Sequence, residues 1–311
     1  MAMTADDTAA RAGRLAIWAA LAACLSTSLG GSSFVAIRFL VMETEPATIA
    51  FLRTAGAALV LTPIAFALVR RWPSPRELLI IGVMGAVFFG VVQFLFSSAM
   101  TFTTSGRAAF TFMTTPFLTL ILAAIFRIER PTRFKVAGVV IASAGVIVAL
   151  RQSSEAPPDA WIGDLIVLLG AFITAGYNVW SSRWLRLHEP LVVVVAGVLP
   201  GTLLLFIVAQ ALGAPTVNPD LSTTGWLAVG FIGLFGAALS YMLWLWALRH
   251  TTPILVAVAL PMNPLMALLW GAVLLGEPVT ASMLVGFGLV IVGIATTNWR
   301  QHRTGARTKA S

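Results

Sequence analysis

The sequence predicts an all-α integral membrane protein whose ten transmembrane helices form two inverted repeats of five helices each. Three observations lead to this fold class. Apolar residues make up 59% of the 311 positions and charged residues 10%, a balance that the surface of a soluble domain of this size does not tolerate. Ten apolar runs follow one another along the chain, most of them close to the ~20 residues that span a hydrocarbon core. The chain also matches itself at a fixed shift.

This internal match rests on Gly, Pro and Glu residues, which often mark the ends and bends of helices. The shift that places Pro116 on Pro264 also places Glu129 on Glu277, without a gap. The same register pairs Gly82 with Gly230, Gly85 with Gly233, Gly138 with Gly286 and Gly145 with Gly293. Chance supplies Leu or Ala matches in so apolar a chain, but agreement of Gly, Pro and Glu is hard to obtain by chance. Because five crossings carry the chain across the membrane, we expect the second copy to lie upside down relative to the first.

The expected crossings, in chain order, are residues 15–39, 47–69, 78–100, 107–127, 134–150, 161–184, 190–212, 224–247, 253–275 and 280–299. A spanning β-barrel is excluded, because its strands of about ten residues alternate in polarity. Runs such as 57–68 and 165–174 do not alternate. The first run is much longer than a signal-peptide core, and Asp6 and Asp7 precede it, so we expect it to remain as the first helix.

The distribution of Lys and Arg predicts the orientation. All but four of the 20 Lys and Arg residues fall on one side of this topology, the exceptions being Arg38, Arg53, Arg107 and Arg151. Cytoplasmic loops retain positive charge during insertion, so both termini are expected in the cytoplasm. The chain then divides into a cytoplasmic N-terminal tail (1–14), a first repeat (15–150), a periplasmic linker (151–160), a second repeat (161–299) and a basic cytoplasmic C-terminal tail (300–311). The net charge of +8 is spread over short segments, so no nucleic-acid partner is expected.

Several classes of chemistry are excluded by the residues that the crossings lack. No Asp or Glu falls near the middle of an expected crossing. Proton and ion pumps place an ionisable group there, so we expect facilitated diffusion, exchange, or coupling through a carboxylate at a helix end. Cys24 is the single cysteine, and the three histidines fall in expected loops or the tail, so no metal or other cofactor is expected. No nucleophile and base can be paired within the crossings, which argues against an enzyme.

Neutral polar residues within the crossings are the candidates for a substrate cavity. The set is Ser32, Ser33, Gln93, Thr114, Thr115, Tyr177, Asn178, Tyr241, Trp244 and Asn263. Two pairs coincide across the repeat, since Gln93 matches Tyr241 and Thr115 matches Asn263. Polar groups are costly in lipid unless they face partners or water, so these side chains are expected to point inward. The alternative is that they only hold helices together.

Three prolines fall within expected crossings, next to these polar residues. Pro116 and Pro264 are equivalent in the repeat, and Pro261 is added in the second copy. A proline inside a helix removes a hydrogen bond and bends the helix. We expect kinks that shape the cavity and act as a gate; the alternative is a static kink required for packing.

Two further features concern packing and charge. The crossings at 134–150 and 280–299 are rich in glycine and alanine, so they are expected to pack closely as struts, or alternatively to form the contact of a homodimer. Arg53 and Arg107 are expected near the outer boundary. There they either pair with Glu43 or Glu45 or attract a carboxylate at the outer mouth.

Three motifs resemble a known family. The segment Gly31-Ser-Ser-Phe-Val-Ala-Ile-Arg38 resembles the opening of the EamA type of the drug/metabolite transporter superfamily. The pair Glu129-Arg-Pro-Thr132 and Glu277-Pro-Val-Thr280 resembles the family's signature before the last helix of each half. This resemblance implies ten helices in two inverted halves, a place in the bacterial inner membrane, and transport of small organic solutes, frequently export of amino acids.

Together these features favour a secondary transporter that works by alternating access. No Lys or Arg is expected at mid-depth, so an amphipathic or zwitterionic solute suits the cavity better than a phosphate. The leading hypothesis is outward movement of amino acids or related metabolites, with the lipid bilayer and the small-molecule substrate as partners. A multidrug exporter is the alternative. A non-transporting membrane scaffold or sensor is a hypothesis of another class, and it predicts an interior whose polar groups satisfy one another.

Overall fold

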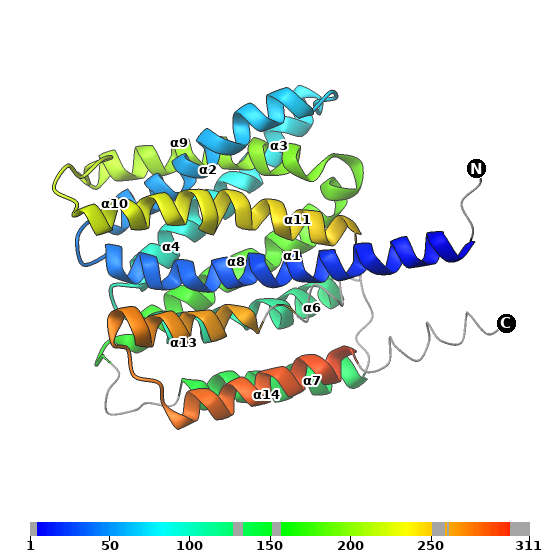
Figure 1. Cartoon of the computed structure of the whole chain (residues 1–311). Coiled ribbons are helices and arrows are strands. Elements are labelled where there is room, and N and C mark those ends of the chain that lie inside the picture. Colours follow the sequence, from blue (N-terminus) through cyan, green and yellow to red (C-terminus); the bar gives the residue numbers. More distant parts are fainter. Residues whose placement is uncertain (1–4, 127–132, 151–156, 251–258, 260, 299–311) are drawn as a thin grey trace.

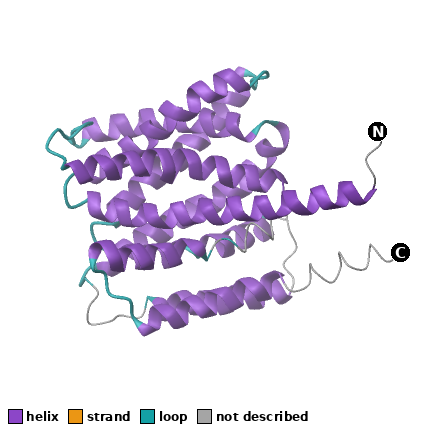
Figure 2. Ribbon diagram, viewed as in Figure 1, coloured by secondary structure: helices purple, strands orange, loops and turns teal. Residues whose placement is uncertain are grey.

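The computed structural model describes residues 5–126, 133–150, 157–250, 259 and 261–298. Within these ranges every regular element is a helix, and the helices lie roughly along one common direction (Figures 1 and 2). The helical character predicted from composition is therefore confirmed.

The helices, in chain order, are α1 (Ala5–Leu40), α2 (Pro46–Leu68), α3 (Pro75–Ala86), the π-helix η1 (Val87–Val91), α4 (Val92–Ala99), α5 (Ser105–Phe112), α6 (Thr115–Ile125), α7 (Arg133–Ala149), α8 (Ala160–Leu187), α9 (Pro190–Ala211), α10 (Thr223–Gly230), the π-helix η2 (Phe231–Leu239), α11 (Ser240–His250), α13 (Met262–Leu275) and α14 (Ala281–Asn298). Most of these bounds lie close to those of the apolar runs, but α1 begins ten residues before its expected run, at Ala5, and so includes Asp6, Asp7, Arg11 and Arg14. Several helices start on a proline in their first turn, as α2 and α9 do, where no backbone donor is needed.

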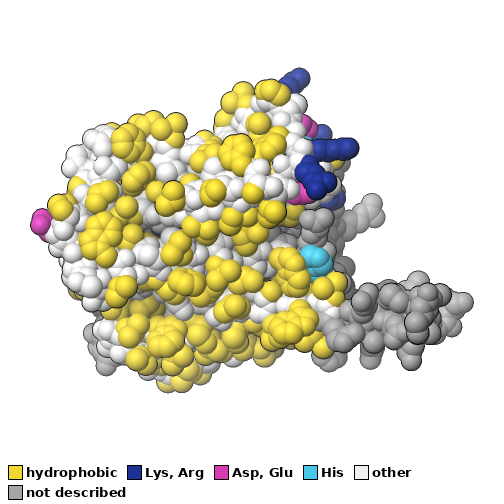
Figure 3. Space-filling model, turned by 45° about the horizontal axis from the view of Figure 1, so that its top comes forward, with side chains coloured by type: hydrophobic (Ala, Val, Ile, Leu, Met, Phe, Trp, Pro, Cys, Tyr) yellow, Lys and Arg dark blue, Asp and Glu magenta, His cyan; other side chains and the backbone are white. Residues whose placement is uncertain are grey.

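Within the residues that the structure describes, six helical stretches are long and apolar enough to cross a membrane. They are Ile17–Leu40, Pro46–Leu68, Pro75–Ala99, Ala160–Leu187, Pro190–Ala211 and Thr223–Trp244. Val136–Ala149, Met262–Leu275 and Ala281–Gly293 are apolar but shorter. Large apolar side chains cover much of the visible side of the bundle (Figure 3), as expected for a wall that faces lipid.

The two ends of the bundle differ in charge. Helix α1 begins and α14 ends at the same end, which we call the near end (Figure 1). Lys and Arg side chains gather at this end (Figure 3), where Arg70 and Arg71 in the α2–α3 connection and Arg76 in the first turn of α3 are exposed. The opposite end, where α1 ends and α14 begins, is called the far end.

Glycines bring helices from the two halves of the chain into backbone contact. Gly85 of α3 lies against Gly197 of α9. Gly56 of α2 lies against Gly233 of η2, so closely that a Cβ atom on Gly56 would stand 3.0 Å from the Gly233 Cα. Small residues permit such approaches between apolar helices. The second and third helical stretches of one half therefore pack on the third and second of the other.

Helices α7 and α14 form a tightly packed pair along one side of the bundle (Figure 1). A Cβ atom on Gly145 would stand 2.8 Å from the Gly286 carbonyl oxygen, and one on Gly293 would stand 2.6 Å from the Ala142 Cβ. The predicted close packing of these two segments is confirmed. Gly145, Gly286 and Gly293 are therefore used for packing within one chain, whereas Gly288 of the same set is exposed, and a homodimer stays a prediction.

Replacing Gly286 by alanine is expected to destabilise the protein by about 1–3 kcal/mol, the usual cost of overpacking. The added methyl group would stand 2.5 Å from the Gly145 carbonyl oxygen and 2.6 Å from the Ala149 Cβ. Gly288 on the same helix has no atom within 4 Å of such a methyl group, so Gly288→Ala is the matched control. Thermal unfolding of the two purified variants in detergent compares them. Equal melting temperatures would contradict the packing described here.

Candidate functional site

Three polar side chains from different helices meet inside the apolar bundle. Arg53 lies on α2, Gln93 on α4 and Tyr241 on α11. The Gln93 side-chain amide donates a hydrogen bond to the Tyr241 hydroxyl, with Nε2 and Oη 3.3 Å apart. The Arg53 guanidinium also interacts with the Tyr241 hydroxyl. We call Arg53, Gln93 and Tyr241 the polar centre.

Arg53 lies deeper than the sequence analysis placed it. Its side chain is 9% exposed, and its Nη2 donates to the carbonyl oxygen of Gly236, in the middle of the span Thr223–Trp244, at 3.3 Å. The structure thus buries Arg53 against the middle of another span, and its role as an outer-mouth charge stays a prediction. About two turns of α2 separate Arg53 from the start of that helix at Pro46, and this depth was the signal that could have placed it.

Several buried polar atoms at and near the polar centre have no hydrogen-bond partner among the described residues. They include Arg53 Nε, Gln93 Oε1 and Asn263 Oδ1. A buried polar atom left without a partner costs about 1–3 kcal/mol. The polar centre therefore offers both a donor and an acceptor to a molecule that enters it.

An aromatic cluster borders the polar centre. The Tyr177 ring stacks on Phe88, with ring centroids 4.3 Å apart and planes inclined by 6°. Phe89 contacts both Tyr177 and Tyr241 edge-on, with centroids 6.1 Å and 5.4 Å apart. Trp180 continues the cluster, 5.9 Å from Tyr177. Such rings provide an apolar surface for an uncharged organic group.

Other predicted cavity residues occupy different places. Asn178 is exposed, although it follows Tyr177. Trp244 is half-buried and packs against a cluster of alanines that contains Ala23 and Ala247. The helix-one serines donate within their own helix, Ser32 to the Ser28 carbonyl and Ser33 to the Leu29 carbonyl. Ser33 nevertheless lies directly against Gly236, which accepts from Arg53.

The sequence analysis missed one polar contact between helices. Ser26 of α1 and Ser240 of α11 donate to each other's backbone carbonyls, at 2.7 Å and 3.0 Å. Thr27 donates to the carbonyl of Ala259 at 2.8 Å. Hydroxyl residues inside an apolar run were the available signal. These groups join α1 to the second half of the chain.

The chain breaks where the sequence predicted a bend. Helix α5 ends at Phe112, and α6 begins at Thr115 with Pro116 in its first turn. The Thr114 and Thr115 hydroxyls donate to the carbonyls of Thr111 and Phe112, both at 2.7 Å, which satisfies acceptors exposed by the break. Proline in a first turn requires no backbone donor, so α6 can begin there. Met113 and Thr114, between the two helices, keep right-handed helical backbone angles, and the expected kink at Pro116 stays a prediction.

The other two of the three predicted prolines lie at the start of another helix. Pro261 precedes α13 and Pro264 lies in its first turn, while residues 251–258 and 260 are outside the described residues. Asn263 of this turn lies against α1, since a Cβ atom on Gly30 would stand 3.3 Å from the Asn263 side-chain nitrogen.

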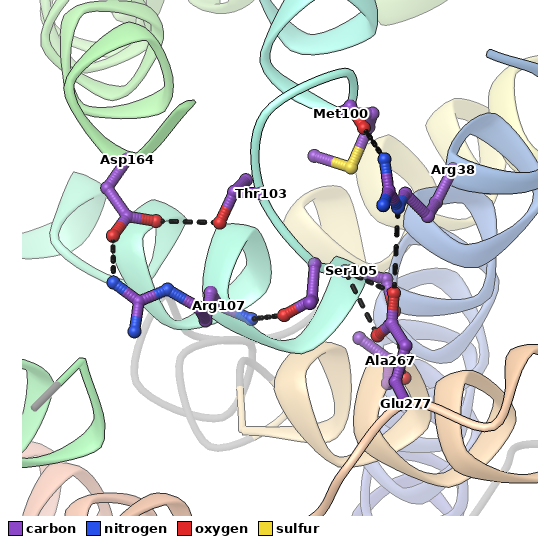
Figure 4. A network of polar contacts seen from close by, with 9 residues as sticks. Arg38, Met100, Thr103, Ser105, Arg107, Asp164, Ala267 and Glu277 are labelled. Atoms are coloured by element: carbon purple, nitrogen blue, oxygen red, sulfur yellow. Dashed lines mark hydrogen bonds and ion pairs between the residues drawn. The ribbon is translucent and has the colours of Figure 1, made fainter. Parts of the chain in front are cut away.

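A second group of charged residues connects helices at the far end (Figure 4). Glu277, in the connection between α13 and α14, accepts from the backbone nitrogen of Ser105 at 3.0 Å and from its hydroxyl at 2.6 Å. Arg38 of α1 lies 4.0 Å from the same carboxylate and also donates to the Met100 carbonyl at 2.5 Å. Glu277 thus links the ends of α1, α5 and α13. Its counterpart in the repeat, Glu129, lies outside the described residues.

An ion pair completes the far end (Figure 4). The Arg107 guanidinium of α5 donates to the Asp164 carboxylate of α8, and the Thr103 hydroxyl donates to the same carboxylate at 3.0 Å. The side chains of Arg107 and Asp164 are 8% and 12% exposed. The sequence analysis proposed Glu43 or Glu45 as the partner of Arg107. Glu43 instead accepts from the backbone and hydroxyl of Ser222. We call the contacts of Glu277 and Asp164 the far-end network.

The sequence resembles known transporters over nearly its whole length. The model of the EamA-like transporter family matches residues 17–151 and again residues 161–299. An "Uncharacterized transporter" of Archaeoglobus fulgidus is 29% identical, covering 89% of this chain and 96% of the relative. The "Uncharacterized inner membrane transporter YedA" of Escherichia coli strain K12 is 28% identical, covering 85% of each chain. A "Probable amino-acid metabolite efflux pump" of Salmonella typhimurium is 28% identical, covering 88% of this chain and 92% of the relative.

One solved crystal structure has a similar fold. It aligns with a TM-score of 0.66 at 21% identity and covers 95% of this chain and 99% of its own. At this identity the similarity shows the arrangement of helices alone.

Proposed function

The chain belongs to the EamA-like transporter family, and from this premise we propose that it is a secondary transporter of the bacterial inner membrane that moves amino acids or related amphipathic metabolites outward by alternating access. The observation that carries the proposal is the polar centre, in which buried donor and acceptor atoms lack partners inside an apolar bundle. A scaffold or sensor would instead have an interior whose polar groups satisfy one another. The names of two relatives support export from the cell and the inner membrane as its place.

The two halves are proposed to be inverted repeats with ten crossings. The family model matches twice, once in each half. Gln93 and Tyr241, which are 148 positions apart and equivalent in the repeat, contact each other. Equivalent residues of two copies touch only near the axis that relates the copies, so this contact supports an inverted repeat whose axis passes near the polar centre. A π-helix also interrupts the third helical stretch of each half, as η1 and η2.

The direction of opening follows from the charged contacts. We assign the near end to the cytoplasm, because Lys and Arg gather there. The far-end network then closes the periplasmic side. Release of a solute to the periplasm requires this network to separate, and the break between α5 and α6 supplies a point at which α5 can move.

An amino acid fits the polar centre better than the cationic compounds typical of multidrug export. Arg53 is a buried cation without a carboxylate partner among the described residues, so it repels a positively charged drug and attracts a carboxylate. The aromatic cluster beside it offers an apolar surface for a side chain.

Purified protein in proteoliposomes is expected to exchange labelled amino acids at a rate that depends little on a pH gradient. This follows from the lack of Asp or Glu in the middle of the described spans. Uptake is measured with and without the gradient, with empty liposomes as the control and ethidium as a cationic competitor. Transport of ethidium but of no amino acid would favour the multidrug alternative. Absence of any transport would favour the scaffold alternative.

A further inference from the structure

Arg53 differs from Arg38 and Arg107, the two arginines of the far-end network. Arg38 has Glu277 beside it, and Arg107 is paired with Asp164. Arg53 is 9% exposed and has no acidic side chain within ion-pair distance among the described residues. A guanidinium stays charged in proteins, and a buried unpaired charge costs several kcal/mol. An anion that binds from outside the chain would remove this cost.

We propose that Arg53 binds the carboxylate of the transported amino acid, and that Gln93 Oε1 accepts a hydrogen bond from its ammonium group. This inference rests on the proposed transport function and specifies the chemistry of the same site. It assigns Arg53 to the binding site, whereas its position in the sequence assigned it to the outer mouth.

The geometry of Arg53 leaves part of its guanidinium available. Nη2 donates to the Gly236 carbonyl at 3.3 Å, which orients the group, while Nε has no partner among the described residues. Arginine binds carboxylates through parallel donors of its planar fork, and Nε belongs to that fork. A peptide carbonyl does not neutralise the charge, so the interaction with a carboxylate remains to be made.

The neighbouring residues suit the other groups of an amino acid. The Gln93 side chain is 4% exposed, its Nε2 is fixed by the Tyr241 hydroxyl, and its Oε1 lacks a partner in the described part of the chain. Tyr241 interacts with Arg53 as well, so the residues that carry the unused acceptor and the unused donor both contact one hydroxyl group. Phe89, which packs on Tyr241, also contacts Tyr177, and the Tyr177 ring stacks on Phe88. The polar centre and the aromatic cluster thus provide a cation, an acceptor and an apolar surface for the carboxylate, the ammonium group and the side chain of an amino acid.

The test compares amino acids with their amides on purified protein. L-phenylalanine, L-leucine and L-methionine are each paired with the corresponding amide, which keeps the shape but lacks the negative charge. We expect at least one amino acid to raise the melting temperature of the unaltered protein, and its amide to have little effect. In Arg53→Gln the concentration needed for the same shift should rise about tenfold or more. Arg53→Lys, which keeps the charge but loses the fork, should lie between the two.

The controls separate this inference from the proposed function. Arg76→Gln removes an exposed arginine and should respond as the unaltered protein does. Equal stabilisation of Arg53→Gln and the unaltered protein by the amino acid would overturn the inference, as would equal stabilisation by acid and amide, or no stabilisation by any of the three acids. Stabilisation that requires Arg53, in a protein that transports nothing in liposomes, would overturn the transport function and leave the binding site standing.

Discussion

Replacing Asp164 by asparagine is expected to destabilise the protein by about 3–5 kcal/mol, because it leaves the Arg107 charge buried without a counter-ion. The two side chains are 8% and 12% exposed, so solvent screens them little. The remaining bonds of Arg107 do not replace the carboxylate, since its Nη1 donates to the neutral carbonyl of Leu150 at 3.0 Å. Unfolding of the purified variant in detergent, followed by heat or denaturant, measures the loss.

A double-mutant cycle tests whether the loss comes from the unpaired charge. Removing both charges in Asp164→Asn with Arg107→Gln should destabilise less than the sum of the two single changes, by about 1–3 kcal/mol of coupling. Glu189→Gln is the control, because Glu189 is an exposed carboxylate whose side chain caps no helix. If each single variant stays within about 0.5 kcal/mol of the unaltered protein, the pair is not buried as the structure has it.

Most ends of the described helices could be located from the sequence to within a few residues, because the apolarity of a run is a local property. The start of α1 at Ala5 could not, since the apolar run was expected from residue 15. Residues 190–212 were expected as a crossing, and α9 is Pro190–Ala211. The close packing at Gly145 and Gly286 could also be predicted, because both glycines lie in runs of small residues, and such runs mainly allow helices to approach each other. The repeat added the correspondence between Gln93 and Tyr241, and the structure places these two side chains in contact.

The partners of charged residues could not be predicted, because they depend on which helices become neighbours. Arg107 and Asp164 are 57 positions apart, and Ser105 and Glu277 are 172 apart. Glu43 and Glu45 were the carboxylates nearest to Arg53 along the chain, but the fold turns Glu43 toward Ser222. Proline likewise marks the break before α6 to within a few residues. The hydrogen bonds of the Thr114 and Thr115 hydroxyls to the carbonyls before the break are not part of a proline rule.

Replacing Glu277 by glutamine is expected to open the far end more often, by a factor of about 10–100. A hydrogen bond to a charged group contributes about 1.5–3 kcal/mol, and each 1.4 kcal/mol changes an equilibrium tenfold. The carboxylate holds Ser105 through both its backbone nitrogen and its hydroxyl, and it faces Arg38. A glutamine offers one neutral oxygen acceptor and no charge, so α5 should separate more readily from α1 and from the α13–α14 connection.

A cysteine introduced on α5, one turn further into the bundle than the far-end network, reports this opening. Thr111 lies on α5 one turn past Arg107, is 3% exposed, and donates only to the Arg107 carbonyl among the described residues. In a Cys24→Ser background, Thr111→Cys should react slowly with a membrane-impermeant maleimide added from the periplasmic side of spheroplasts. Adding Glu277→Gln should speed this reaction about tenfold or more, and Glu189→Gln should not. An Asp220→Cys reporter, which is exposed, controls for access of the reagent.

The side of the membrane from which the maleimide reacts shows which end of the protein Glu277 holds closed. If Glu277 closes the periplasmic side, faster labelling of Thr111→Cys must appear with reagent added outside, and labelling from the cytoplasmic side of inverted vesicles should fall, because the two openings compete in alternating access. Acceleration from both sides at once would mean that loss of Glu277 loosens α5 generally. An unchanged rate from outside would show that Glu277 only caps the first turn of α5, and that the far end is held closed by Arg107 and Asp164.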